Sequence, residues 1–133
     1  MAANHPAPAN APAMNAFEAA RARRLRPADL PHSATSHRFE GHTFGAVDIS
    51  FFVTDAPAGT GPRLHRHPDA EVFVIEEGAV TFTVGDEAID AVAGDIVVVP
   101  AGCPHKFVNR GPGRARHLDL HASGRMETDW LEA

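Results

Sequence analysis

Residues 65 to 71 of the sequence place three potential metal ligands close together. His65 and His67 are two positions apart, and Glu71 follows four positions after the second histidine. Because side chains alternate between the two faces of a strand, both imidazoles point to the same side. A metal ion needs three or four donor atoms that converge on one point, and this group supplies three. The spacing makes a metal site the first hypothesis for this stretch.

A fourth candidate ligand, His105, lies in the stretch GDIVVVPAGCPHKFVN. It follows a valine-rich strand and a tight turn over residues 100–102, which would return the imidazole to the mouth of a barrel. Cys103 is the only cysteine of the chain. A disulfide within the chain and a cysteine-based zinc site are therefore excluded, and we expect this single loop thiol to be inert.

Short strands must position these ligands. From residue 38 onward, apolar runs alternate with Gly, Pro and Asp, and Gly85-Asp86 reads as a two-residue hairpin turn. So many short strands, with turns every eight to twelve residues, predict an all-β barrel or sandwich. The expected strands are 46–54, 63–67, 71–76, 79–84, 88–92, 96–99, 104–109 and 115–121.

The two histidine-containing stretches match the two motifs of the cupin superfamily. The first motif, G(X)5HXH(X)3,4E(X)6G, is met from Gly59 to Gly78, and the second, G(X)5PXG(X)2H(X)3N, from Gly94 to Asn109. The chain therefore resembles a small single-domain microbial cupin of the conserved-barrel type. The resemblance implies a double-stranded β-helix, or jelly-roll, barrel. It also gives Asn109 a structural role at a turn or strand end.

The resemblance further implies one divalent transition metal per chain. Its expected ligands are His65, His67, Glu71 and His105, and Glu71 is also the expected catalytic residue. Three imidazoles and one carboxylate leave about two positions of an octahedral shell open. This ligand set suits Fe(II), Mn(II), Ni(II), Co(II), Cu(II) or Zn(II), and the sequence does not choose among them.

Three further residues are candidates for substrate binding. Phe73 shares the parity of Glu71 and Phe107 that of His105, so both are expected to line an apolar pocket, although either also fits plain core. Arg63 shares the parity of His65 and could hold an anionic group of a substrate. The alternative for Arg63, which we slightly prefer, is a structural ion pair at the barrel rim.

The last expected strand alternates polar and apolar residues. His117, Asp119 and His121 share one face, and Leu118 and Leu120 share the other. We expect the leucines to be buried and the polar residues to be exposed. In the alternative arrangement the polar residues face the lumen and relay protons.

The two ends of the chain differ from the patterned part. Residues 1–36 form the expected N-terminal tail, which is disordered to about residue 16, with a possible short helix over residues 17–26. Residues 37–133 form the barrel and a short C-terminal tail. There, residues 126–133 are expected to add a helical turn that packs Trp130 and Leu131 against the outside.

Composition limits the partners of the chain. The net charge is −5, with no Lys or Arg cluster in the patterned part, so nucleic acid and anionic membranes are not expected as partners. No apolar segment reads as a secretory signal or membrane span, so we expect a cytoplasmic protein. The expected partner is a small-molecule substrate. The resemblance also implies a homodimer, in whose interface residues 37–52 are expected to take part.

Three hypotheses for the function stay open. The first is a metal-dependent dioxygenase or related oxidoreductase that acts on a small organic molecule. The second is a redox-neutral isomerase, lyase or cyclase, which the absence of tyrosine slightly disfavours because no phenol can act as an acid. The third is a non-catalytic module that binds or senses a small molecule or metal. A short chain without a DNA-binding region counts against a role in transcription.

Overall fold

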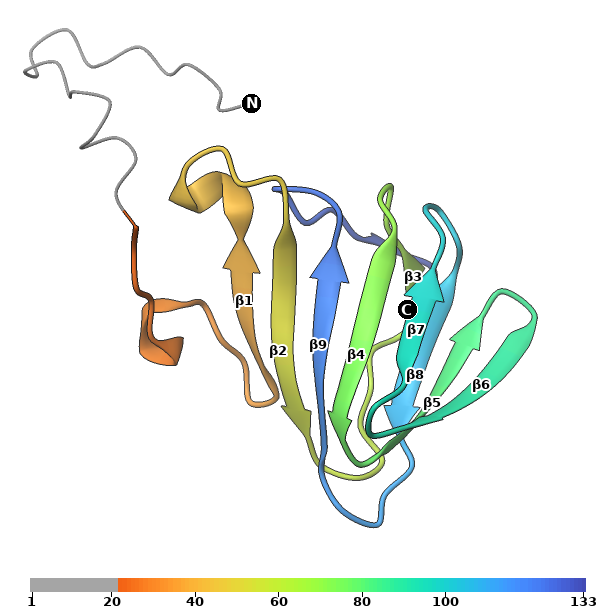
Figure 1. Ribbon diagram of the computed structural model, residues 1–133. Coiled ribbons are helices and arrows are strands. Elements are labelled where there is room, and N and C mark those ends of the chain that lie inside the picture. Colours follow the sequence, from red (N-terminus) through yellow and green to blue (C-terminus); the bar gives the residue numbers. More distant parts are fainter. Residues whose placement is uncertain (1–21) are drawn as a thin grey trace, which may run out of the picture.

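Two five-stranded antiparallel sheets form the protein, as the computed structural model of residues 22–133 shows (Figure 1). One sheet has the strand order β1-β2-β9-β4-β7, and the other has the order β10-β3-β8-β5-β6. This arrangement confirms the expected all-β jelly-roll barrel. The strands are β1 Ser36–Glu40, β2 Ser50–Ala56, β3 His65–Arg66, β4 Glu71–Glu77, β5 Ala79–Val84, β6 Glu87–Val92, β7 Ile96–Val99, β8 His105–Asn109, β9 Ala115–His121 and β10 Asp129–Trp130.

Alternation along the strands builds an apolar core at one end of the barrel. On β4, Phe73 and Ile75 point inward and are fully buried, whereas Val72 and Val74 on the other face are half-buried. Phe82 and Val80 of β5 meet them from the opposite sheet. Burying side chains of this size contributes about 1.5–3 kcal/mol each, so this cluster anchors the two sheets to each other. The remaining members of the core are Ala91, Val97, Val99 and Ala115.

Two glycines mark turns that the strands require. Gly85 has a φ of 57° and opens the hairpin between β5 and β6, where Val84 pairs with Glu87 as expected. Gly78, between β4 and β5, has a φ of 86°, and a Cβ there would lie 2.5 Å from the carbonyl oxygen of Arg114. A larger residue at this position would be both strained and too close to the neighbouring backbone.

The N-terminal part differs from the expectation in its details. The expected helix falls partly on residues 17–21, which lie outside the described residues, and residues 22–26 are not helical. The first element is the short 3₁₀ helix η1, Pro27–Asp29. A second one, η2, Gly41–Phe44, follows β1, so β2 begins at Ser50 rather than at residue 46. The division of the chain near residue 36 stays a prediction.

The expected C-terminal helical turn is wrong. The end of the chain forms β10 instead, which pairs with β3 through Trp130 and His65. The N–H of Leu131 donates to the carbonyl oxygen of Leu64, and Arg66 forms an ion pair with Asp129. The C-terminal segment therefore covers β3, the strand that carries His65.

The expectation for β9 is also wrong, because its polar residues are the buried ones. His117, Asp119 and His121 are each at most 3% exposed, whereas Leu118 and Leu120 are only half-buried on the outer face. The reason is the position of β9 between β2 and β4, which turns the face that carries Asp119 toward the inside of the barrel.

Within residues 22–133, no helix has the length and hydrophobicity that crossing a membrane requires. The cytoplasmic location expected from the sequence stays a prediction.

Candidate metal centre and pocket

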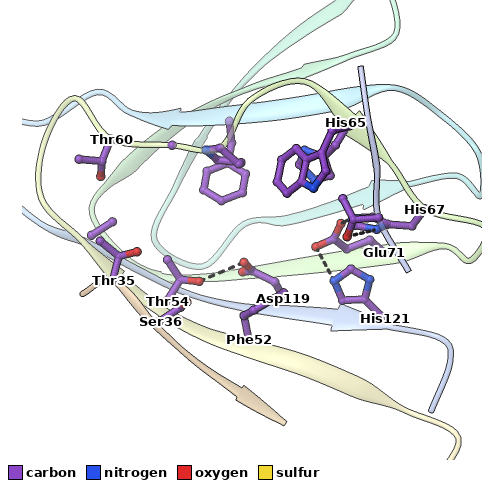
Figure 2. Close-up of a pocket in the computed structure, with 16 residues that line it drawn as sticks. Thr35, Ser36, Phe52, Thr54, Thr60, His65, His67, Glu71, Asp119 and His121 are labelled. Carbon is purple, nitrogen blue, oxygen red and sulfur yellow. Dashed lines mark hydrogen bonds and ion pairs between the residues drawn. The ribbon is translucent and has the colours of Figure 1, made fainter. Parts of the chain in front are cut away.

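The four expected metal ligands converge inside the barrel. His65 on β3 pairs with His105 on β8, Glu71 begins β4 in the facing sheet, and His67 follows β3 directly. One ligand atom from each of the four lies within 4.8 Å of the others, and all four residues are buried. Figure 2 shows His65, His67 and Glu71 at one end of the pocket.

Backbone carbonyls orient all three imidazoles. Each Nδ1 faces a carbonyl oxygen: His65 faces that of Arg63 at 2.6 Å, His67 that of Glu127 at 2.8 Å, and His105 that of Cys103 at 2.9 Å. A carbonyl oxygen only accepts, so each Nδ1 carries the hydrogen and donates it. In the neutral ring the other nitrogen, Nε2, therefore presents a lone pair to the centre, which is how metal-binding histidines are usually held.

The position of Glu71 shows why a cation suits this centre. Its Oε1 lies 2.9 Å from Nε2 of His105 and 3.4 Å from Nε2 of His67. With both Nδ1 atoms already protonated, neutral rings would direct nitrogen lone pairs at a carboxylate. Protons on the rings or a cation between them must remove this repulsion. The donor set of three nitrogens and one carboxylate oxygen fits a divalent transition metal.

The electrostatics of the centre favour an ionised Glu71 and a neutral His65 near neutral pH. Burial would raise the pKa of Glu71, but hydrogen bonds from His105, His121 and His67 outweigh it and hold the pKa well below its usual range. Burial lowers the pKa of His65 to about 4, so that ring is neutral at pH 7. Burial also opposes the charge on His67, but hydrogen bonds to Glu71 and to the carbonyl of Glu127 raise its pKa.

His121 lies beside this group without belonging to the expected ligand set. Its Nε2 is 3.2 Å from Oε2 of Glu71, the oxygen not shared with His105, and its Nδ1 is 3.4 Å from Oδ2 of Asp69. Its side chain is 1% exposed. The ring therefore separates two buried carboxylates and limits the orientation of Glu71.

A pocket of about 310 Å³ opens from the centre. Its walls include Phe52, Phe107 and Trp130, and the Trp130 ring centre lies 5.1 Å from that of His65. Among the described residues that line it, none is Lys or Arg. The other lining residues are Thr35, Ser36, Thr54, Ala56, Thr60, Gly61, Pro62, His65, His67, Glu71, Asp119, His121 and Thr128.

Comparison with known proteins identifies the family. The family model for the cupin domain, Cupin_2, matches residues 51–121, more than half of the chain. The chain belongs to the cupin family. A protein of uncharacterised function from Streptomyces coelicolor is 40% identical over 61 residues, which cover 46% of this cupin and 56% of that protein. The HTH-type transcriptional regulator PuuR of Escherichia coli is 29% identical over 70 residues, which cover 53% of this cupin and 38% of the regulator.

Solved structures agree on the fold of this cupin. Oxalate decarboxylase from Lactobacillus farciminis, solved as a formate complex, superimposes with a TM-score of 0.68 at 20% identity, over 78% of this cupin and 34% of that chain. The Cnp3 cupin domain of Schizosaccharomyces pombe gives 0.55 at 22% identity, over 59% of this cupin and 58% of that chain. At these identities the likeness shows the fold alone. This cupin spans about a third to just over half of the length of these proteins and of the curated relatives.

Of the three expected substrate-binding residues, only one lines the pocket. Phe107 lines the pocket, whereas Phe73 is fully buried in the apolar core against Phe82. The guanidinium of Arg63 lies 4.8 Å above the ring of Trp130, and the Arg63 side chain does not line the pocket. The roles proposed for these residues stay predictions, and their positions favour Phe107.

Asn109 has the structural role that the motif implies. Its Nδ2 donates to the carbonyl oxygens of Ala56 and Gly113 at 2.8 and 3.1 Å, and its Oδ1 accepts from the N–H of Gly111 at 2.9 Å. The side chain therefore ties the loop after β8 to the end of β2, and the expected role is confirmed.

Sequence reasoning did not assign Asp119 and Thr54 to the pocket. Thr54 donates to Oδ2 of Asp119 at 3.1 Å, and Nδ1 of His117 forms a short contact with Oδ1 of Asp119. Burial raises the pKa of Asp119 to about 6, against the hydrogen bonds from His117 and Thr54. The signal that pointed here was the polar alternation on β9, but it did not tell which face lies inside.

Proposed function

We propose that this cupin is a metal-dependent oxidoreductase of the dioxygenase type, acting on a small organic molecule in the 310 Å³ pocket. His65, His67, Glu71 and His105 would hold one divalent transition metal. The observation that carries the proposal is the set of Nε2 lone pairs aimed, with a carboxylate, at one buried point. A redox-active metal there would supply open coordination positions and electron transfer to O₂.

The chain itself supplies the remaining parts of such a site. Glu71 is the anionic ligand and, with His121 against its second oxygen, the nearest group to accept or return a substrate proton. Phe52, Phe107 and Trp130 give apolar walls that limit water around the bound molecule. Nitrogen-rich coordination disfavours Mg²⁺ and Ca²⁺, which prefer oxygen ligands. Mn(II) centres are named in Bacillus subtilis oxalate decarboxylase, so Mn(II) is among the metals to test.

Two alternatives each have an observation in their favour. Asp119 lines the pocket and is paired with the buried His117, an arrangement that suits proton transfer in a redox-neutral isomerase, lyase or cyclase. The similarity to PuuR, named as a transcriptional regulator, suits a module that binds a small molecule without converting it.

Metal content and O₂ uptake test the three functions together. We would measure metals in the purified full chain, remove them with a chelator, restore Fe(II), Mn(II), Ni(II), Co(II), Cu(II) or Zn(II) singly, and follow O₂ with diketones, phenols and thiols. Substrate-linked O₂ consumption that needs the metal supports the dioxygenase. Turnover under argon supports the redox-neutral enzyme, and saturable binding without turnover supports the binding module.

A matched pair of variants assigns any metal to this centre. His105→Gln removes one ligand, whereas His42→Gln changes an exposed histidine that pairs with Glu40. We expect metal retention to be lost only in the first variant. Equal metal content in both variants, or a wild-type chain that takes up none of the six metals, would overturn the metal centre and with it the enzyme proposal.

A further inference from the structure

The pocket has two polar ends with different chemistry. One end holds His65, His67 and Glu71, which form the expected metal-binding group together with His105. Figure 2 shows Thr35, Ser36, Thr54 and Thr60 gathered at the other end, with Asp119 between the two groups. A molecule that fills the pocket must therefore satisfy both ends.

Asp119 is the charged group that a bound molecule would meet beyond the metal centre. It lines the pocket although it is only 3% exposed. Thr54 and His117 each donate to one of its oxygens, and each oxygen keeps a further lone pair for a substrate donor. Its raised pKa of about 6, caused by burial, still leaves the carboxylate ionised at pH 8.

The surrounding charges decide what this carboxylate can accept. Among the described residues lining the pocket there is no Lys or Arg to pair with a substrate anion. Glu71 adds a second negative charge at the metal end. An anionic substrate group therefore meets no Lys or Arg and finds its charged partner at the metal, and the part of the substrate near Asp119 is favoured if it donates hydrogen bonds or carries positive charge.

We propose that Asp119, supported by Thr54, is the specificity-determining residue that accepts a hydroxyl or ammonium group from a substrate whose opposite end binds at the metal. This inference rests on the proposed metal-dependent function and names its substrate class. The substrate is a small molecule with oxygen ligands at one end and a hydrogen-bond donor at the other. Asp119 is two positions from His121 on β9, and His121 pairs with Glu71, so Asp119 lies about 7 Å along the strand from the metal end.

The aromatic walls sharpen the substrate class further. Phe52 and Phe107 line the same pocket as Asp119 and the metal end. Flat rings suit such walls, because aromatic pairs gain energy beyond the area they bury. A catechol that carries a short amino-substituted chain has all three features: two oxygen ligands, a flat ring and a donor.

Two catechols whose short side chains carry opposite charges test the inference. Dopamine carries an ammonium, and 3,4-dihydroxyphenylacetate carries a carboxylate. The full chain would be loaded with Ni(II) at pH 8 under argon, and the affinity of each catechol would be measured by calorimetry. We expect dopamine to bind about tenfold more tightly, since a hydrogen bond to a charged group is worth about that factor.

Asp119→Asn keeps the shape of the side chain and removes its charge. We expect the preference for dopamine to shrink to less than about threefold, with Ni(II) affinity unchanged, because the amide no longer attracts the ammonium. Asp90→Asn, on the exposed side of β6, is the control and should keep the full preference.

The outcomes separate this inference from the proposed function. Equal or reversed affinities in the wild-type chain, no binding of either catechol to the Ni(II)-loaded protein, or an undiminished preference in Asp119→Asn would each overturn it. The wild-type comparison holds even if the variant does not fold. A chain that takes up no Ni(II) contradicts the metal centre instead, which the metal measurement reports before any catechol is added.

Discussion

The two faces of the sheet β1-β2-β9-β4-β7 differ in polarity. In a simple barrel the inner face would be apolar and the outer face polar, but on much of this sheet the reverse holds. The face toward the barrel carries buried polar side chains on β9, among them Asp119 and His121. The face away from the barrel is apolar across the strands, and Ile96 and Val98 on β7 are 64% and 61% exposed. One row of that face, in register, is Phe39, Phe51, Leu120, Val72 and Val98, and the next is Val53, Leu118, Val74 and Ile96.

This contrast explains how polar residues remain stable inside the barrel. A buried polar group is costly unless it is paired, and Asp119 is paired with Thr54 and His117. The Asp119 side chain of the inner face is therefore satisfied by its neighbours, and burial of the apolar cluster around Phe73 contributes to stability. An apolar outer face of this extent is unusual for a monomer, because large exposed apolar patches mark interaction sites.

The largest effect expected is on stability, at the inner face of β4. Phe73→Ala should lower the free energy of unfolding by about 3–5 kcal/mol, because a fully buried ring leaves a cavity between the sheets. Val72→Ala, one position away on the outer face, should cost about 1 kcal/mol, since that side chain is half-buried. Urea unfolding of both variants measures the difference. Similar losses would mean that the two faces of β4 contribute equally.

Two glutamates on opposite faces of β4 test whether metal affinity depends on Glu71 itself or only on the negative charge of the strand. Glu71→Gln should weaken metal affinity by more than about 100-fold, because loss of outer-sphere partners alone costs about 10–100-fold and this residue is an expected ligand. Glu76→Gln removes an exposed carboxylate from the same strand and should leave the affinity unchanged. Competition with a chromophoric chelator measures both values. Unchanged affinity in Glu71→Gln would remove this residue from the ligand set.

The pH dependence of stability provides a third comparison, between a buried and an exposed aspartate. The pKa of Asp119 is about 6 in the folded protein against an ordinary 3.8. Between these values the folded protein binds the proton more tightly than the unfolded chain, so this contribution to stability falls as the pH rises from about 4 to about 6. Relative to Asp119→Asn, the wild type should lose on the order of 1–3 kcal/mol over this range.

Asp90→Asn is the control with the opposite sign. Hydrogen bonding by Thr81 and the charge of Arg110 lower the pKa of Asp90, so its contribution is present above the ordinary pKa and is lost as the pH falls. Unfolding measured at several pH values from below the ordinary aspartate pKa of 3.8 up to 7 checks both variants. A wild-type curve parallel to that of Asp119→Asn would show that the buried carboxylate does not titrate differently on folding.

The ligand cluster was predictable from the sequence, because motif spacing fixes it locally. His65 and His67 share a face by parity, and the turn before His105 returns that ring to the same point, as the structure shows. The polar face of β9 was not predictable in the same way. The alternation of side chains along β9 shows that Asp119 and Leu118 point in opposite directions. Only the pairing of β9 with β2 and β4 decides which direction is inward.

The C-terminal end escaped prediction for a related reason. β10 has two residues, and its pairing with β3 depends on contacts far apart in the sequence. A two-residue strand has no periodicity to detect. Trp130 was therefore expected on the outside, although it lines the pocket and lies against His65.

The apolar outer face leads to the last and smallest effect. The homodimer expected from the family resemblance stays a prediction, and we propose that a second copy of the chain covers this face. The face suits self-association because Ile96 and Val98 on it are mostly exposed and would be covered by a partner.

A charge placed in the middle of this face should separate the copies. Leu118→Lys would bury an unpaired ammonium between them and should raise the dimer dissociation constant by about tenfold or more, which corresponds to about 1–2 kcal/mol. Val108→Lys changes an exposed apolar residue of the other sheet and should leave the dimer intact. Light scattering coupled to size exclusion gives the mass at each concentration. If the wild type had the mass of one chain throughout, or if only Val108→Lys dissociated, the outer face would not be the surface that joins two copies.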